Sequence, residues 1–335
     1  MSAATWQRLF DLRRAWDEPA AVLISSLLAL GLLLSPLVIL GLDRAVKLES
    51  TLREDLWRRY RSWLFLIPLL VVPIMLGACW AIVSVCLLSI LCFREFARTT
   101  GFFREKLMNL LVILGIFGLG FACFDHWYRL FVALTPMVIV VIAAVSTSLD
   151  RPRGYIQRVA LASLSFLLFG TCLGHMGYLA NDTHYRSLML LLIFSIHVND
   201  VCVFIVGQCA GGPKLAPETS PNKTVAGSMA AIVLTTIVVF AVGAVVFPEG
   251  RMHSPWLRLL LGVVISIAGQ MGDLTISAIK RDVGLKAAGS WIPGAGGVLE
   301  RANSLLLAAP ALFHYVNYAQ TIGADQTARI FTGGG

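Results

Sequence analysis

The sequence predicts an all-α, polytopic helical membrane protein with about nine to ten transmembrane helices. Hydrophobic residues make up 57% of its 335 residues and charged residues only 14%, whereas soluble chains carry roughly 25% charged residues. The mean hydropathy is +0.78. The apolar segments are close to the roughly 20 residues that a helix needs to cross a bilayer, and they lack the alternating strands of a membrane barrel. This composition excludes a soluble enzyme, a disordered chain and a disulfide scaffold.

The expected helices follow the apolar runs in chain order. The run from Trp63 to Phe93 is too long for one span, and Gly77 divides it into two helices. The first run lacks a small-residue cleavage site, so we expect an anchor and not a removable signal peptide. Helices are therefore expected at about 20–42, 63–77, 79–97, 106–123, 128–147, 157–179, 187–207, 224–247, 256–280 and 304–321.

Before the first apolar run, large apolar side chains alternate with three arginines. This pattern predicts an interfacial helix or, alternatively, a solvated basic tail. The residues concerned are Trp6, Leu9, Phe10, Leu12, Arg8, Arg13 and Arg14.

The distribution of basic residues predicts the orientation. Nineteen of the 27 Lys and Arg residues fall in five alternate loops, and the positive-inside rule places that side in the cytoplasm. The N-terminus then lies on the opposite side, unless the first run, broken at Ser35-Pro36, is re-entrant or lies in the interface and leaves the tail cytoplasmic. Because these charges lie beside lipid head groups, the net charge of +8 indicates membrane contact and no nucleic acid. The five loops are 43–62, 94–106, 148–158, 207–223 and 280–301.

The cysteines and histidines predict no metal site. Seven cysteines, an odd number, lie mostly in apolar segments without a Cys-x-x-Cys pair, so they are expected to be small apolar packing residues. The six histidines lack metal-ligand spacing. His197 lies one turn from Asp200 and is interpreted as structural.

Two carboxylates inside the expected helices demand a functional reason, because an ionisable group at the bilayer centre costs about 2.5–3.5 kcal/mol. Asp200 and Asp273 each lie late in a run that heads for the predicted cytoplasmic face. We therefore expect both to meet in one inward-opening cavity.

A polar stripe surrounds Asp273. Ser277, Lys280 and Arg281 follow at i+4, i+7 and i+8, on one helical face. A carboxylate, a hydroxyl and two cations in this order suit a metal ion with a polyphosphate beside it. The alternative for Lys280 and Arg281 is that they are basic residues snorkelling at a helix end.

Two loops on the same side have the composition of phosphate sites. The segment 211–224 carries Lys214 and Lys223 and leads directly into a helix, whose N-terminus favours anions. The segment 292–297 is rich in glycine, which allows the backbone to approach a phosphate closely. Each loop by itself also fits an ordinary turn between helices.

Together these residues resemble the phosphatidate cytidylyltransferase (CDP-diacylglycerol synthase) family. The order and spacing of that family's C-terminal signature hold without a gap over 32 residues. The resemblance is firm over about 188–310, looser over 60–187 and absent before residue 60. The signature residues are Gly272-Asp273, Ser277, Lys280-Arg281, Lys286-Ala287, Pro293-Gly-Ala-Gly-Gly297, Glu300-Arg301 and Asn303. Upstream echoes are Arg94-Glu95-Phe96, Asp200, Phe204, Gly207, Leu215-Ala-Pro217, Ser220-Pro221, Lys223-Thr224 and Gly227.

The resemblance implies transfer of a cytidylyl group from CTP to phosphatidic acid, giving CDP-diacylglycerol and pyrophosphate. It also implies Mg²⁺, a second cation such as K⁺, a homodimer, and a multi-pass location in the inner (plasma) membrane with a cytoplasmic active site. The implied catalytic residues are Asp273, Lys280, Arg281, Glu300 and Arg301, and the implied metal ligands are Asp273, Glu300, Asp200 and Asn303. The implied nucleotide- and phosphate-binding residues are Lys214, Ser220, Lys223, Thr224, Ser277, Lys286, Gly294, Gly296 and Gly297.

The resemblance divides the chain into an N-terminal interfacial segment with an extra anchor helix (1–60), N-terminal membrane helices (61–187), the catalytic region (188–321) and a flexible tail (322–335).

Several departures from the signature mark a divergent member. Ala287 and Ala295 replace an aspartate and a histidine, and Phe204 replaces a tyrosine. Glu300 and Asn303 stand where the signature has aspartates. Transfer to another lipid phosphate and a non-catalytic relative therefore stay open as alternatives. An ion-coupled transporter is the alternative from another class. The phosphate-type loops and the lack of a visible repeat count against it.

Overall fold

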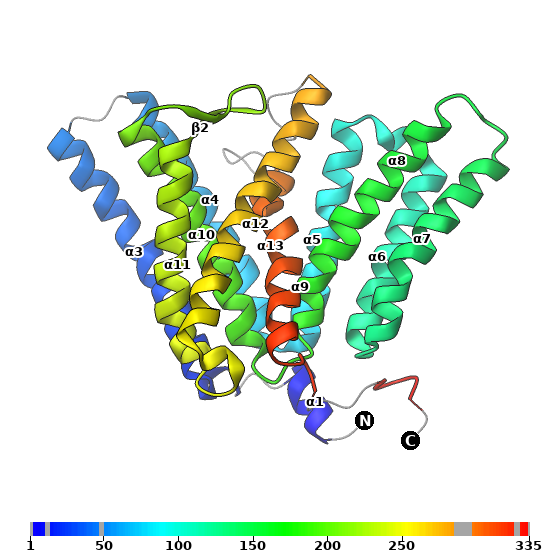
Figure 1. Cartoon of the computed structure of the whole chain (residues 1–335), viewed down its shortest axis with the longest axis horizontal. Helices are drawn as coiled ribbons and strands as arrows, with labels where there is room; N and C mark the ends of the chain where they lie inside the picture. Colours follow the sequence, from blue (N-terminus) through cyan, green and yellow to red (C-terminus); the bar gives the residue numbers. More distant parts are fainter. Residues whose placement is uncertain (1–2, 11–13, 47–49, 285–296, 325–328, 334–335) are drawn as a thin grey trace.

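The computed structural model describes residues 3–10, 14–46, 50–284, 297–324 and 329–333, and it consists almost entirely of packed helices (Figure 1). The α-helices are α1 (Ala3–Phe10), α2 (Arg14–Asp17), α3 (Pro19–Val46), α4 (Ser50–Leu76), α5 (Ala78–Thr99), α6 (Lys106–Phe124), α7 (Tyr128–Ser148), α8 (Tyr155–Ser165), α9 (Leu173–Leu179), α10 (Tyr185–Ala210), α11 (Val225–Val246), α12 (Pro255–Asp282) and α13 (Val298–Ala319). Shorter elements are the 3₁₀ turns η1 (Phe102–Arg104) and η3 (Arg251–His253), the π-helical η2 (Phe166–Cys172), and the strands β1 (Lys214–Ala216) and β2 (Ser220–Thr224).

The structure confirms the polytopic helical fold class. Within the described ranges, eight helices are long and apolar enough to cross a membrane: α3, α5, α6, α7, the continuous α8–η2–α9 unit, α10, α11 and α12. Of the two other expected spans, α4 contributes a shorter apolar part, Ile67–Leu76. The second, α13, begins with polar side chains that belong to the site described below. The protein is an integral membrane protein.

The largest differences from the expected elements lie at boundaries and in one loop. Helix α4 begins at Ser50, before the apolar run starts, and α13 begins at Val298 instead of near 304. The loop 211–224 contains an unpredicted antiparallel hairpin in which Lys214 pairs with Thr224. Short polar strands carry no alternating apolar pattern, so hydropathy does not reveal them.

All the helix ends that the charge pattern predicts to share one face do so in the structure. Figure 1 shows the C-terminal ends of α3, α5, α7, α10 and α12 at the end of the bundle that carries the β1–β2 hairpin, here called the hairpin end. Both chain termini lie at the opposite end. The alternation of the five basic loops therefore agrees with the fold.

The N-terminal segment is helical, as expected, but it packs into the protein. Arg8 and Leu9 of α1 are buried, and the guanidinium of Arg8 donates a hydrogen bond to Asn181 at 3.1 Å. The backbone carbonyl of Leu9 lies so close to Gly77 that a side chain there would collide with it, and Gly77 has a φ of +146°. This arrangement excludes the solvated tail for these residues.

The described end of the chain is also bound, in contrast to the flexible tail expected there. The backbone N–H of Phe331 donates to Asp125 at 2.5 Å, and the hydroxyl of Thr332 donates to the other carboxylate oxygen at 2.6 Å. The ring of Phe331 stacks on Phe124. Asp125 thus holds this segment at the α6–α7 turn.

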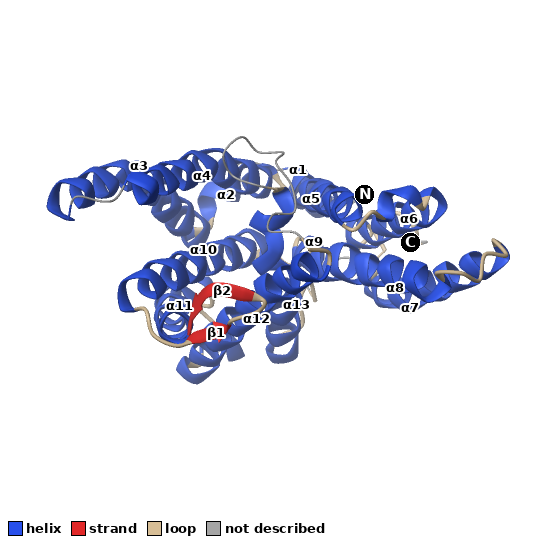
Figure 2. Cartoon of the chain, turned by 90° about the horizontal axis from the view of Figure 1, so that it is seen from above, coloured by secondary structure: helices blue, strands red, loops and turns tan. Residues whose placement is uncertain are grey.

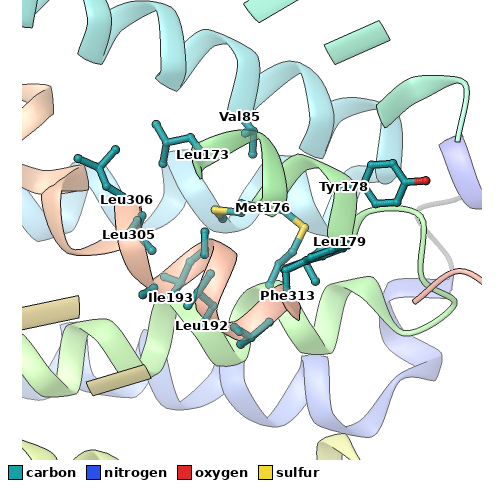
Figure 3. Close-up of a cluster of buried hydrophobic side chains, with 14 of the residues drawn as sticks. Val85, Leu173, Met176, Tyr178, Leu179, Leu192, Ile193, Leu305, Leu306 and Phe313 are labelled. Atoms are coloured by element: carbon teal, nitrogen blue, oxygen red, sulfur yellow. The ribbon is translucent and has the colours of Figure 1, made fainter. Parts of the chain in front are cut away.

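The core lies around α13, which sits between α5, α9, α10 and α12 (Figure 1). Figure 3 shows Leu305, Leu306 and Phe313 of α13 facing Leu173 and Met176 across this core. All five are buried. Helix α13 is therefore fixed by apolar packing over most of its length, and its polar first turns are held at a set depth.

Glycines allow the helices of the C-terminal half to approach at backbone distance, as small residues do in membrane proteins generally. A Cβ added at Gly227 of α11 would lie 2.7 Å from the Val203 carbonyl of α10. A Cβ at Gly262 of α12 would meet Thr236 of α11 at 2.6 Å. These contacts bring α10, α11 and α12 together tightly beneath the hairpin.

We expect Gly227→Ala to separate α10 from α11 and to destabilise the protein by about 1–3 kcal/mol, because the obstructing atom is backbone that cannot rotate away. The matched control is Gly31→Ala, since nothing lies within 4 Å of a Cβ at Gly31 of α3. Thermal unfolding in detergent measures both. Equal melting temperatures for the two variants would contradict the close approach.

Candidate functional site

Asp273 of α12 is the centre at which three distant segments meet. One of its carboxylate oxygens forms an ion pair with the ammonium group of Lys223 in β2. The other accepts a hydrogen bond from the side-chain amide of Asn303 in α13. Figure 2, a view from above, shows the hairpin lying over α11 and α12 beside α10. The predicted contributions of the hairpin and of the signature residues therefore converge.

Asp200 of α10 reaches the same centre. Its two carboxylate oxygens accept from the hydroxyl of Ser304 at 3.1 and 3.3 Å. The backbone N–H of Ser304 in turn donates to the amide oxygen of Asn303 at 2.7 Å. The neighbouring residues Asn303 and Ser304 of α13 therefore connect Asp273 with Asp200. The structure thus brings together three of the four predicted metal ligands: Asp200, Asp273 and Asn303.

Close contact between backbones makes this possible. A Cβ at Gly272 would lie 2.5 Å from the carbonyl oxygen of Asn303 and 3.3 Å from that of Ser304. Glycine at this position lets the backbones of α12 and α13 come into contact at the residue that precedes Asp273. The Gly-Asp pair is therefore a packing feature as well as a chemical one.

A buried polar network supports Asp200 from beneath. Asn199 is fully buried, accepts from Ser266 at 2.6 Å and from Gln270 at 3.4 Å, and donates to Asp200 at 3.4 Å. The hydroxyl of Ser228 in α11 also bonds to Gln270. Sequence reasoning missed the roles of Ser266, Gln270 and Ser304, although two polar residues four apart in an apolar run are a usable signal.

Glu300 lies against Lys280, at 3.1 Å, instead of against Asp273. Both residues belong to the α12–α13 interface, so Glu300 stays near the centre, but its charge is balanced by Lys280. Arg301 follows in the first turns of α13 and acts electrostatically on half-buried His197. His197 itself bonds to the carbonyl of Ile193 at 2.6 Å, in agreement with a structural role.

The predicted phosphate-binding residues and the predicted catalytic residue Arg281 separate into three groups. The hydroxyl of Thr224 caps α11 by accepting from the N–H of Gly227 at 3.1 Å, so it is engaged in the fold. Arg281 donates to the carbonyl of Thr219 at 3.3 Å and fastens the hairpin turn to α12. The others that are described lie on the hairpin or on α12 near Asp273: Lys214, Ser220, Lys223 and Ser277. Lys286, Gly294 and Gly296 lie outside the described residues.

Glu95 of α5 is a site residue whose role the sequence did not reveal. Its buried carboxylate accepts from the backbone N–H of Leu299 at 2.9 Å and also from that of Val298, and so caps the N-terminus of α13. A Cβ at Gly297 would overlap this carboxylate. The structure therefore explains the predicted phosphate-binding Gly297 as the residue that admits Glu95.

Comparisons with known proteins bear on this arrangement. The model described as "Cytidylyltransferase family" matches residues 57–319. The chain belongs to the cytidylyltransferase family.

Individual relatives agree with this membership. The phosphatidate cytidylyltransferase of Bacillus subtilis is 30% identical over 219 residues, which is 63% of this chain and 80% of the relative. That of Staphylococcus haemolyticus is 31% identical over 166 residues, 50% of this chain and 62% of the relative. The Escherichia coli protein named "Uncharacterized protein YnbB" is 29% identical over 237 residues, 69% of this chain and 77% of the relative.

As a member of the cytidylyltransferase family, the protein is a nucleotidyltransferase enzyme. The matched range begins within α4 and contains all the site residues described above, from Glu95 to Ser304. Helices α1 to α3 precede it, which agrees with the resemblance being absent before residue 60. The family core therefore coincides with the helices that build the site.

We expect Glu95→Ala to loosen the first turn of α13, because two backbone N–H groups lose a charged acceptor that is worth about 1.5–3 kcal/mol. Hydrogen exchange at Leu299 should then accelerate by about tenfold or more, whereas Glu95→Gln should have a smaller effect because its amide oxygen still accepts. Glu105→Ala is the control, since Glu105 precedes α6 without a side-chain cap. Unchanged exchange in Glu95→Ala would contradict the capping role.

Proposed function

We propose that this protein transfers a cytidylyl group from CTP to phosphatidic acid, releasing pyrophosphate and forming CDP-diacylglycerol. The observation that carries the proposal is the meeting of Asp200 and Asp273 with Lys223 at the hairpin end. Membership of the cytidylyltransferase family and the names of the Bacillus and Staphylococcus relatives support the choice of nucleotide and lipid.

The donor set fits Mg²⁺. Divalent magnesium prefers carboxylate and neutral oxygen ligands, and Asp200, Asp273 and Asn303 supply these. No group of three His, Cys, Asp or Glu residues forms a cluster within the described ranges, so the acidic part of the site is this pair. Lys223 neutralises Asp273 and Lys280 neutralises Glu300, whereas Asp200 makes no ion pair in the same ranges. A carboxylate in a membrane helix that makes no direct ion pair favours a bound cation.

Asp273 and Asp200 would hold Mg²⁺, with Asn303 as a neutral ligand, and a second cation such as K⁺ would lie nearby. Glu300 joins this set only if it leaves Lys280. When bound, the metal supplies positive charge that stabilises the leaving pyrophosphate.

The protein's own groups have separate tasks in the transfer. An oxygen of the lipid phosphate attacks the α-phosphorus of CTP, and the bond from that phosphorus to the bridging oxygen of the pyrophosphate breaks. The acceptor is already an anion and needs no strong base. Lys223, Lys280 and Arg301 lower the repulsion between the two phosphate groups, which is the main electrostatic obstacle to the attack.

The surroundings of the site fit substrates that arrive from two phases. CTP would enter from the cytoplasm at the hairpin end, where the basic loops are gathered, and the lipid would enter from the bilayer between helices. We further propose an inner-membrane location with this end cytoplasmic, and a homodimer as the assembled form.

The assay uses purified protein in detergent with labelled CTP, Mg²⁺ and phosphatidic acid, and measures lipid-extractable cytidine label. Asp273→Asn should lower the rate about 100- to 1,000-fold, the usual cost of one charge-stabilising group. Asp282→Asn, an exposed aspartate on the same helix, is the matched control and should retain activity. Equal label from both variants, or none from the unaltered protein with phosphatidic acid, would contradict the proposal.

Asn303 gives a second test, because its amide nitrogen faces Asp273 and its oxygen faces the N–H of Ser304. Asn303→Asp exchanges a donor for a charged oxygen ligand. We expect the Mg²⁺ concentration for half-maximal activity to fall several-fold, since ligand charge raises affinity for hard cations. A Mg²⁺ titration of both proteins measures this, and an unchanged or higher midpoint would place the metal elsewhere.

A further inference from the structure

A groove on the outer side of α5 and α6 lies apart from the carboxylate centre. The two helices are joined at the hairpin end by the short turn η1, and the space between them has a volume of about 680 Å³. Figure 1 shows both helices on the side of the bundle away from α11. Pockets for small ligands commonly have volumes of roughly 300–1,000 Å³.

The lining of this groove changes from cationic to apolar with depth. Arg98, near the end of α5, and Lys106, the first residue of α6, lie at the hairpin end, and Arg94 lies one turn deeper. Leu110 and Ile113 follow one and two turns along α6, about 6 and 10 Å from Lys106 at 1.5 Å per residue. A phospholipid has the same order of groups, with its phosphate at the membrane surface and its acyl chain beneath it.

Charge distinguishes this groove from a neighbouring one of similar size. The groove at the α7–α8 turn has a volume of about 850 Å³, but Arg151 in its lining is accompanied by Asp150. The α5–α6 lining contains three basic residues and no acidic residue. Glu105 lies beside it at the start of α6, and Glu95 lies beneath it with its carboxylate on the N-terminus of α13. The groove thus has an excess of positive charge.

We propose that the α5–α6 groove is a binding site for an anionic phospholipid, whose phosphate contacts Arg98 and Lys106 and whose acyl chain lies along Leu110 and Ile113. This lipid is not the one that reacts, because α13 packs between α5 and helix α12, which carries Asp273. The groove is linked to the catalytic region through α5, because Glu95 of the same helix caps the N-terminus of α13. The proposal does not depend on the transfer of a cytidylyl group.

The test uses the full-length protein in nanodiscs of phosphatidylcholine and a phosphatidic acid with a photoreactive acyl chain. Cross-links mapped by mass spectrometry should fall between Phe103 and Ile113, and unlabelled phosphatidic acid should compete while inorganic phosphate should not. R98Q/K106Q should weaken labelling about 25-fold, at about fivefold for each basic residue removed. Lys106→Gln alone, at an exposed position, should weaken it about fivefold and covers the case in which the double variant does not fold.

Two controls separate this site from the reaction. Arg151→Gln should label like the unaltered protein, and Asp273→Asn should keep full labelling of the groove even where turnover is lost. Equal labelling by a photoreactive phosphatidylcholine, no effect of R98Q/K106Q, or cross-links confined to α10–α13 would overturn the proposal. Displacement by inorganic phosphate alone would also overturn it, because the acyl chain would then contribute nothing.

Discussion

Asp200 and Asp273 lie in membrane helices, and the structure around them is built to compensate the negative charges of their carboxylates. Asp273 has an ion pair and an amide donor, whereas Asp200 has hydroxyl and amide donors and makes no direct ion pair among the described residues. Lys223 comes from β2, and Asn303 and Ser304 come from α13, so the charge requirement ties β2 and α13 to the helices α10 and α12 that carry the two carboxylates. Removal of any one partner leaves a half-buried carboxylate with less compensation for its charge, and this loss destabilises the site.

This requirement explains the packing around the site. Polar groups can reach the two carboxylates only if the helices approach closely, and Gly227, Gly262 and Gly272 allow that approach. The network of Asn199, Ser266, Gln270 and Ser228 then satisfies polar atoms that would be costly in hydrocarbon. Outside this region the bundle needs no such contacts, and long apolar helices such as α7 expose most of their surface.

The sequence predicted what hydropathy and helical periodicity encode. Apolar runs located the ten helices, and the cost of burying charge singled out Asp200 and Asp273 correctly as partners. Contacts set by tertiary geometry were not predictable: Glu95 reaches α13 across 204 positions of sequence, and no local pattern records this. Thr224 and Gly297 show the same limit, because a hydroxyl at a helix start and a glycine in a loop suit a phosphate or a packing role equally well.

Two of the departures from the signature, Glu300 and Asn303, differ in their effect on the charge of the site. Glu300 retains a negative charge, and its ion pair with Lys280 balances it. Asn303 removes a charge and donates to Asp273, so the amide partly occupies the carboxylate that a metal would need. Since the N–H of Ser304 fixes the amide oxygen, a bound cation must displace the amide nitrogen or use the remaining face of Asp273. The departure at Asn303 therefore changes how strongly Asp273 is available to a metal, whereas Lys223 and Asp200 keep the rest of the centre in place.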